Sequence, residues 1–301
     1  MNKSLLLNVK NLSISFRNTK NNVEVVHSIS FHINRNEILG VVGESGSGKS
    51  VTAMAILGLL SKKESSVGGE LLFEGQDLLS LTNENIRKLR GSKIAMIFQE
   101  PMTALNPSMT CGEQVSEIIS LHLKKTKSKI KKEVISLFKK VKLPRPDEIY
   151  NNYPHQISGG QMQRVMIAMA IACKPKLLIA DEPTTALDVT VQKEIIALLK
   201  EIQKETKMSL LFISHDLGLV SQISDRTLVM YQGNIVEEGT VQEIFKAPKK
   251  SYTKALMSSR PGLKGRLKVL PTITSLSKKE FTPIEVTPQE RAFKHKKRIL
   301  F

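Results

Sequence analysis

The sequence has little cysteine and no long apolar run. Its two cysteines, Cys111 and Cys173, form no CxxC pair and lie near no histidine cluster, so we expect no zinc site and two reduced, structural thiols. No uninterrupted apolar stretch approaches the roughly 18 residues that span a bilayer, and the segment from Met1 to Lys10 lacks the charged and apolar parts of a signal peptide. The sequence therefore predicts a chain that stays in the cytosol.

Acidic residues are few relative to basic ones, and the imbalance is local. The formal net charge is +17. Residues 246–301 hold fifteen basic residues against three acidic ones, and residues 121–145 hold ten against one, so the rest of the chain is slightly acidic. Two solvated faces explain this pattern, and so do surfaces that meet anionic lipid headgroups or the cytoplasmic loops of a membrane partner. No nucleic acid is expected as a partner, because neither segment interleaves aromatic side chains that stack on bases.

The apolar pattern predicts two kinds of β structure. Apolar and polar residues alternate through the first forty residues, as they do over 5–16, with an Asn-rich break at 18–22, which predicts a small antiparallel β layer. Short, continuously apolar runs at 37–42, 176–180 and 209–213 are typical of strands that are buried on both faces. Such strands indicate a parallel sheet covered by helices, so the predicted fold class is α/β.

Helical patterns lie between these strands. Residues 51–60 have helical character directly after the first buried strand, and residues 112–145 place Ile and Leu at helical spacing among lysines. The second segment predicts a helical insertion into the sheet plan. After Phe245 the periodicity fades into Pro, Lys and Thr, which predicts an extended tail.

A glycine-rich motif follows the strand at 37–42 and fits the phosphate-loop pattern GxxxxGK[ST]. Glycines let backbone N–H groups turn toward phosphate oxygens, while the lysine reaches the terminal phosphates of ATP and the final serine can bind Mg²⁺. A simple glycine-rich turn is disfavoured, because the flanking strand and the Lys-Ser ending would both be accidental. The predicted phosphate site consists of Gly43, Glu44, Ser45, Gly46, Ser47, Gly48, Lys49, Ser50 and Val51.

Two adjacent carboxylates end the apolar strand at 176–180. Ligands of open α/β sheets bind at the carboxyl ends of the strands, and Asp181 and Glu182 stand at that position. We expect Asp181 to hold Mg²⁺, directly or through water, and Glu182 to polarise the water that attacks the γ-phosphate. A single Asp-Glu pair is equally common in an acidic turn after a strand.

The segment ISGGQ, which starts at Ile157 shortly before the acidic strand, resembles the signature motif of the ABC ATPase family. Its serine and glycines can offer a hydroxyl and N–H groups at a helix start, which makes a second anion site. A helix start with a capping serine is the plainer interpretation. In the family this site meets ATP held by the opposite subunit, so the resemblance assigns a half-site to Ser158, Gly159, Gly160 and Gln161.

Four further residues match family positions by their order. Gln99, Asp188 and His215 resemble the Q-loop, the D-loop and the switch histidine. The resemblance implies that Gln99 touches Mg²⁺ and senses the membrane partner, that Asp188 links the two sites of a dimer, and that His215 contacts the γ-phosphate. Phe16 resembles the aromatic residue that stacks on adenine, but a place in the core of the β layer fits it equally.

The resemblance extends over nearly the whole chain and implies the fold and the domains. It implies a P-loop NTPase with a RecA-like parallel-sheet core, an N-terminal antiparallel β layer and a helical insertion subdomain. We expect the ATPase domain at 1–260, with the insertion at about 100–165. Residues 261–301 are expected to form a basic tail or linker.

Subfamily detail lies in the segments FQEPMTALNP, from Phe98, and DEPTTALDVTVQ, from Asp181, which look like the ATPases of oligopeptide, dipeptide and nickel importers. That resemblance implies an ATP hydrolase, with ATP and Mg²⁺ bound, at the cytoplasmic face of the cell membrane. Its implied partners are a second ABC ATPase domain, transmembrane permease subunits and, indirectly, an extracytoplasmic substrate-binding protein. No cysteine follows Cys173, so the iron-sulfur cluster of some members is not expected. The end of the chain, 289–301, resembles the linker of tandem members, which suggests half of a fused or split pair.

Two other functions stay open on the sequence alone. A soluble ABC ATPase that handles nucleic acid or ribosomes would use the basic tail for phosphate contacts. A regulatory module that binds nucleotide without hydrolysis is the third alternative. Glu182 argues against it, because a carboxylate at that position serves hydrolysis.

Overall fold

The structure is a computed structural model that describes residues 4–17, 22–185 and 187–258. The chain forms two compact units, Met1–Val241 and Gln242–Phe301, which are described separately. The described part of the second unit contains most of α10 (Val241–Lys246) and all of α11 (Ser251–Ser258). The expectation of an extended chain after Phe245 is therefore wrong for α11, where no proline interrupts the helix. The predicted tail at 261–301 lies outside the described residues.

An antiparallel sheet begins the first unit. Its strand order is β2 (Asn22–Asn34), β1 (Leu5–Arg17), β4 (Ser65–Phe73) and β5 (Gln76–Asp77). In β1 the apolar alternation shifts by one residue between Val9 and Leu12, and both residues are nevertheless buried. A bulge at this point absorbs the extra residue, with Asn11 in the left-handed region at φ 50°.

A second sheet carries the carboxyl ends that matter for function. Its order is β10 (Asn234–Thr240), β9 (Arg226–Tyr231), β3 (Ile38–Val42), β8 (Ser209–Ile213), β7 (Leu177–Asp181) and β6 (Ile94–Ile97). All neighbours are parallel except the antiparallel pair β9 and β10. Every residue of β3, β7 and β8 is buried, which is why these strands appear as continuous apolar runs.

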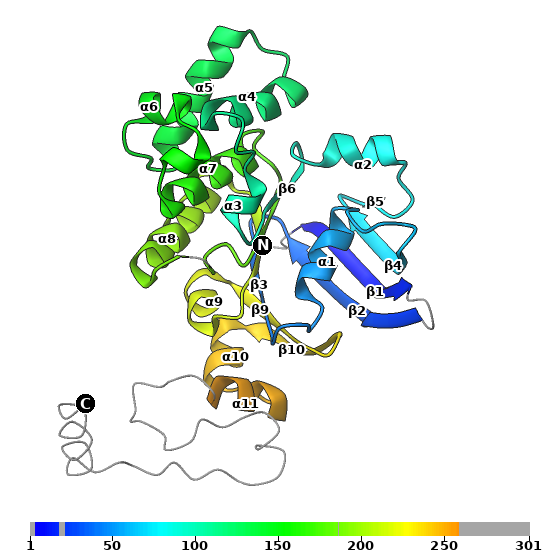
Figure 1. The fold of residues 1–301 in the computed structure, drawn as a ribbon. Coiled ribbons are helices and arrows are strands. Elements are labelled where there is room, and N and C mark those ends of the chain that lie inside the picture. Colours follow the sequence, from blue (N-terminus) through cyan, green and yellow to red (C-terminus); the bar gives the residue numbers. More distant parts are fainter. Residues whose placement is uncertain (1–3, 18–21, 186, 259–301) are drawn as a thin grey trace, which may run out of the picture. The chain divides into compact units, whose positions relative to one another are not determined.

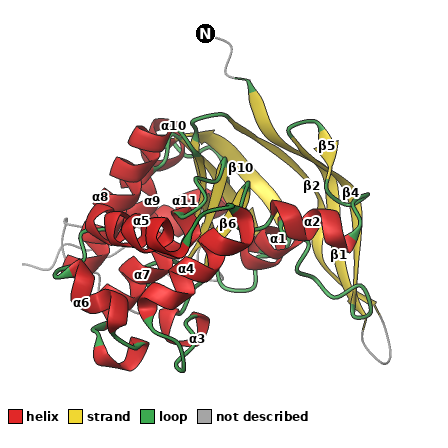
Figure 2. Cartoon of the chain, turned by 90° about the horizontal axis from the view of Figure 1, so that it is seen from above, coloured by secondary structure: helices red, strands yellow, loops and turns green. Residues whose placement is uncertain are grey.

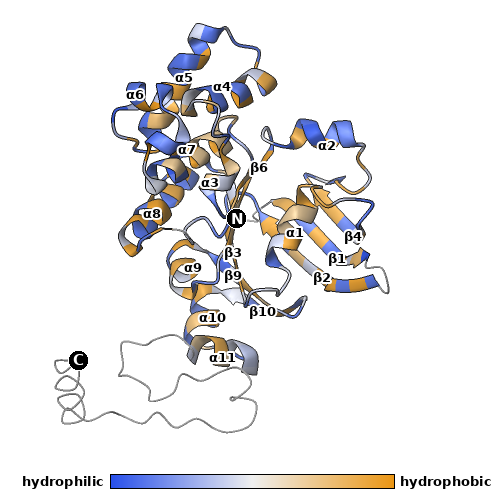
Figure 3. Ribbon diagram, in the orientation of Figure 1, coloured by the Kyte–Doolittle hydropathy of each residue, from blue (hydrophilic) through white to orange (hydrophobic). Residues whose placement is uncertain are grey.

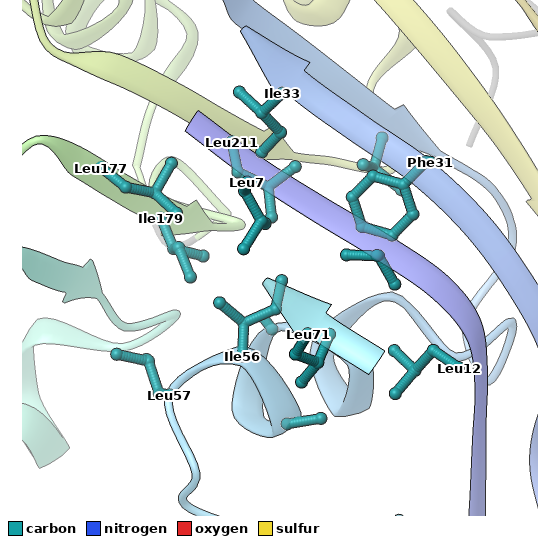
Figure 4. Packing of buried hydrophobic residues seen from close by; sticks show 14 of the residues in the cluster. Leu7, Leu12, Phe31, Ile33, Ile56, Leu57, Leu71, Leu177, Ile179 and Leu211 are labelled. Atoms are coloured by element: carbon teal, nitrogen blue, oxygen red, sulfur yellow. The ribbon is translucent and has the colours of Figure 1, made fainter. Parts of the chain in front are cut away.

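Helix α1 (Lys49–Ile56) fills the space between the two sheets. Figure 1 shows α1 on one side of the parallel strands and α8 (Val189–Thr206) and α9 (Leu217–Ile223) on the other. In Figure 4, Ile56 of α1 lies between Leu71 of β4 and Ile179 of β7, and all three side chains are buried. The helix that follows the glycine-rich loop is therefore fixed by apolar packing against both sheets.

The helical insertion groups several elements at one end of the unit. Figure 2 shows its helices apart from the strands of the antiparallel sheet. In Figure 3 the ribbon of α5 alternates between apolar and polar colouring, and Ile130, Val134 and Phe138 form its buried side. The elements between β6 and β7 are α3 (Pro101–Ala104), α4 (Cys111–His122), α5 (Lys127–Lys140), α6 (Pro146–Asn151), a 3₁₀ turn (Pro154–Gln156) and α7 (Gly159–Ile171).

The strands predicted at 37–42, 176–180 and 209–213 are observed as β3, β7 and β8, but the helix predicted after the first of them has different bounds. The helix expected at 51–60 starts earlier, at Lys49, and ends at Ile56. Gly58 has a φ of 60° and terminates the helix, a signal that the apolar pattern alone did not reveal. Within residues 4–17, 22–185 and 187–258, no helix has both the length and the apolar character needed to cross a bilayer.

Candidate nucleotide site

The glycine-rich loop joins the end of β3 to the start of α1, and its own geometry requires glycine. Gly48 has a φ of 97° and is the N-cap of α1, and Gly46 has a φ of 78°. A Cβ atom on Gly43 would stand 2.2 Å from the carbonyl oxygen of Met230 in β9. The loop can therefore present a concave backbone that larger residues would not allow.

Lys49 is buried at the first position of α1. Its Nζ donates to the carbonyl oxygens of Gly43 and Glu44, at 2.9 and 2.7 Å, and to Ser47 Oγ at 3.3 Å. Burial lowers the pKa of this ammonium, and the nearby carboxylates of Glu182 and Asp181 act in the opposite direction. The loop thus holds one cation in place at the side of the site where phosphates would bind.

Ser50 and Asp181 supply adjacent oxygens on the other side. Ser50 Oγ donates to Asp181 Oδ1 at 3.1 Å, and Asp181 is buried at the end of β7. Burial raises the pKa of Asp181, while the Ser50 hydrogen bond lowers it. A hydroxyl next to a carboxylate is a donor set that suits Mg²⁺, since this ion prefers oxygen ligands and keeps several waters.

Three side chains contact one carboxylate oxygen of Glu182, Oε2. Thr185 Oγ1 donates to it at 2.8 Å, Gln99 Nε2 donates to it at 3.3 Å, and His215 Nδ1 lies 3.1 Å away. Glu182 itself has a φ of 47°, and its N–H donates to the carbonyl oxygen of Ile213 in β8. The strained backbone is fixed by the neighbouring strand, and the carboxylate faces groups that follow β6, β7 and β8.

Most of these groups line one pocket of about 730 Å³, and the buried Asp181 lies outside its lining. The structure thus brings together most of the predicted phosphate loop with Gln99, Glu182 and His215. Thr185 and Val25, which have no predicted role, also line the pocket. Thr185 lies three residues after Glu182, and this spacing is the signal that could have identified it. The lining residues are Val25, Ser45, Gly46, Ser47, Gly48, Lys49, Ser50, Val51, Gln99, Glu182, Thr185 and His215.

Phe16 does not line this pocket. It is partly buried and packs against the apolar cluster between the two sheets, beside the other side chains of β1. Val25 of the paired strand β2 lines the pocket. The position of Phe16 fits the alternative that the sequence left open, and stacking on adenine stays a prediction.

The predicted second half-site also lies outside the pocket. Ser158 is the N-cap of α7, where its Oγ accepts from the Gln161 N–H at 3.3 Å and Gln161 Oε1 accepts from the Ser158 N–H at 2.9 Å. A Cβ atom on Gly159 would find no atom within 4 Å, whereas one on Gly160 would meet Val191 of α8 at 3.1 Å. Nothing in the described chain therefore requires glycine at position 159.

Asp188 begins the next helix in a similar way. Its Oδ1 accepts from the backbone N–H groups of Thr190 and Val191, both at 3.0 Å, so it caps α8. The residue is exposed and does not line the pocket around Glu182. Within the described chain Asp188 has a structural role as a cap, and its predicted role across a dimer stays a prediction.

The fold and the site define a P-loop nucleotide-binding domain, because a glycine-rich loop with Lys49 and Ser50 connects a buried parallel strand to a helix beside Asp181. The ABC transporter family profile matches residues 26–185, and the chain belongs to this family. It is an ATPase whose hydrolysis is coupled to transport, as the sequence resemblance predicted. The predicted fold class is confirmed as well.

Similar proteins are ATP-binding proteins of transport systems. The oligopeptide transport ATP-binding protein OppD of Bacillus subtilis is 47% identical over 286 residues, which cover 95% of this chain and 77% of OppD. The dipeptide transport ATP-binding protein DppD of Haemophilus influenzae is 52% identical over 256 residues, covering 85% and 78%. The glutathione import ATP-binding protein GsiA of Escherichia coli is 47% identical over 264 residues, covering 86% of this chain and 42% of GsiA.

A solved structure of the same fold is an ATP-binding cassette in a dimeric post-hydrolysis state with ADP and phosphate bound. It aligns with a TM-score of 0.71 and 26% identity, covering 78% of this chain and 99% of that one. The comparisons confirm ATP binding and favour transport over the nucleic-acid alternative.

Proposed function

We propose that this chain hydrolyses ATP to drive the import of peptides, with nickel as the other cargo that the subfamily resemblance allows. The names of its relatives support the peptide class, since they are oligopeptide, dipeptide and glutathione transport proteins. Nothing in the nucleotide pocket selects a cargo, so the proposal about cargo rests on similarity.

The observation that carries the proposed chemistry is that the carboxylate of Glu182 lines the same pocket as Lys49. Glu182 accepts the proton of the attacking water, and the hydrogen bonds from Thr185 and Gln99 orient its Oε2. His215 lies against the same oxygen and is placed to contact the γ-phosphate. Lys49 stabilises the negative charge of the terminal phosphates.

Mg²⁺ would be held at Ser50 Oγ and Asp181, with Gln99 as a further ligand at the pocket edge. When bound, the ion supplies charge neutralisation on the phosphate oxygens. Asp181 stands within the first unit at the end of β7 and keeps the hydroxyl of Ser50 oriented. The adjacent oxygen atoms of Ser50 and Asp181 support this proposed Mg²⁺ site, because Mg²⁺ prefers oxygen ligands.

A second ABC ATPase domain completes the pocket. Ser158, Gly159 and Gln161 lie at an exposed helix start, and the open space at Gly159 suits close approach of a phosphate from another chain. Asp188, also exposed, would link the two sites. The dimeric cassette among the solved relatives supports this arrangement, and the 42% coverage of GsiA is compatible with a fused or split pair.

The membrane partner is expected at an apolar groove of about 240 Å³ beside Gln99. Phe98 lines it and is 43% exposed, and Leu59 on the same groove is also 43% exposed. An exposed apolar groove of this kind suits a short amphipathic helix. We propose that permease subunits dock there, that an extracytoplasmic binding protein delivers the cargo, and that the chain sits peripherally at the cytoplasmic face of the membrane.

Replacement of Glu182 by Gln tests the chemistry. The variant keeps the size of the side chain and its ability to form hydrogen bonds, but its amide cannot accept a proton. Its ATPase rate should therefore fall by roughly 100-fold or more while ATP still binds. Phosphate release and ATP binding are measured on the same preparations. Equal ATPase rates of the variant and the wild-type chain would overturn the role of Glu182.

Uptake in a strain that lacks the gene tests the cargo. Cells complemented with the wild-type chain should take up labelled dipeptide and oligopeptide, and cells with E182Q should not. Labelled nickel is supplied in parallel. Nickel uptake without peptide uptake would replace the proposed cargo, and uptake of neither would reject import of both.

A further inference from the structure

Arg90 connects the C-terminal end of helix α2 (Asn83–Leu89) to the C-terminal end of helix α1, and neither Arg90 nor Leu57 lines the nucleotide pocket. Arg90 is the residue that ends α2. Its Nε donates to the carbonyl oxygen of Leu57 at 2.7 Å, and its Nη2 donates to that of Gly58. These carbonyls are at the C-terminal end of α1, where a cation is also favoured by the helix dipole.

The opposite end of the same helix holds the nucleotide residues. Lys49 and Ser50 occupy the first turn of α1, which has eight residues and is therefore about 12 Å long. A helix of this length, packed on both sides by buried side chains, moves as one body. A displacement of its C-terminal end therefore changes the position of Lys49 and Ser50.

Arg90 also forms part of the wall of the apolar groove. The groove is lined by both ends of this contact, Leu57 and Arg90, and by Met96 and Phe98 of the segment that leads to Gln99. An occupant of the groove would thus press on the guanidinium and on the carbonyls that it binds. The planar fork of arginine transmits such a displacement, because both of its bonds are directional.

We propose that Arg90 is a positioning residue that couples occupancy of the groove to the phosphate loop through α1. The route differs from the one through Gln99, which acts on Glu182. The biological meaning rests on the proposed docking of a permease in the groove. The test below contains no permease, so its failure can be distinguished from a failure of that docking.

A double-mutant cycle measures the coupling. Ala104 lines the groove and is exposed, so A104W places an indole ring in the groove without entering the core. Binding of adenylyl imidodiphosphate with Mg²⁺ is measured by calorimetry for the wild type, A104W, R90Q and the double variant. We expect A104W to weaken binding at least about threefold when Arg90 is present and less than about 1.5-fold in the R90Q background.

Two matched variants separate coupling from damage to the fold. Arg87 lies on α2 and is exposed, so A104W should have its full effect in an R87Q background. R90K can still donate to one of the two carbonyls, and should retain about half of the coupling in free-energy terms. The same effect of A104W in the wild-type and R90Q backgrounds, or no effect in either, would overturn the proposal.

Hydrogen exchange supplies a reciprocal readout that does not depend on A104W. Linkage requires that the nucleotide changes the groove by the same coupling by which the groove changes the nucleotide site. Adenylyl imidodiphosphate should slow amide exchange over residues 90–98 in the wild type and in R87Q, and this protection should be lost in R90Q. Protection of residues 90–98 to the same extent in R90Q would contradict the role of Arg90.

Discussion

The phosphate loop and the signature segment are both glycine-rich helix starts, but only the loop is explained by its own chain. Gly48 is in a left-handed conformation, and Lys49 is buried and hydrogen-bonded to the loop. Gly159 stands in open space at the exposed start of α7. Internal packing therefore accounts for the glycines of the phosphate loop, whereas nothing in the described chain requires glycine at position 159.

The largest effect is expected for the buried lysine. Lys49→Met removes a charge-assisted contact to the phosphates, which costs about 3 kcal/mol and therefore weakens ATP binding about 100-fold. The folding stability of the variant should not decrease, because burial disfavours the charged ammonium of Lys49 in the folded state. Calorimetry with ATP and thermal unfolding check both statements. ATP binding that is weakened only slightly would remove Lys49 from the site.

A similar loss is expected at Gly159, but in hydrolysis rather than in binding. Gly159→Asp places a negative charge where a phosphate of the opposite domain would approach, and juxtaposed like charges cost several kcal/mol. ATPase activity should fall by about 100-fold, while binding of ATP to the isolated chain stays within about twofold. If the variant hydrolyses ATP at the wild-type rate, the signature segment has no part in the reaction.

Replacement of Gly48 and of Gly159 by alanine should change the free energy of unfolding by different amounts. Gly48→Ala forces a Cβ atom into the left-handed region and toward the carbonyl oxygen of Val25 at 3.2 Å, which costs about 1–2 kcal/mol. Gly159→Ala adds a methyl group to open space and should leave the unfolding midpoint unchanged or raise it slightly. Urea unfolding of both variants measures the difference. Equal losses would break the contrast between the two segments.

The smallest effect is expected at Thr185. Thr185→Val keeps the shape of the side chain and removes its hydrogen bond to Glu182, worth about 0.5–1.5 kcal/mol, so kcat should fall by about 2–10-fold. The KM for ATP should stay the same, because the bond orients the base and not the nucleotide. Steady-state kinetics with Thr185→Ser as the control, which keeps the hydroxyl, decide this. A change confined to KM would place Thr185 at the nucleotide instead.

Much of the fold was predictable because buried parallel strands have a simple pattern. The apolar runs at 37–42, 176–180 and 209–213 correspond to β3, β7 and β8, which are wholly buried. The strands β4 and β9 were not identified. Glycines and polar residues interrupt the pattern of β4, and β9 begins with a charged residue, so their positions depend on pairing with distant strands.

Most residues that line the pocket could be named from the sequence, but their contacts could not. The meeting of Gln99, Glu182 and His215 follows from strand order, since β6, β7 and β8 are neighbours whose carboxyl ends share one edge. Sequence order does not give sheet order, so the family resemblance supplied this prediction. The spacing of three residues permits the contact of Thr185 with Glu182, but the residue type does not indicate the left-handed backbone at Glu182.

We propose that one chain holds two half-sites, and the concentration dependence of ATP hydrolysis distinguishes this arrangement from a site that is complete in a single chain. ATPase activity per chain is measured from dilute to concentrated protein, with the oligomeric state recorded at each point and with any co-purifying ATPase domain added back. ATPase activity should rise with association of the chains and vanish for the isolated chain. Full activity of a chain that remains monomeric would contradict the proposal.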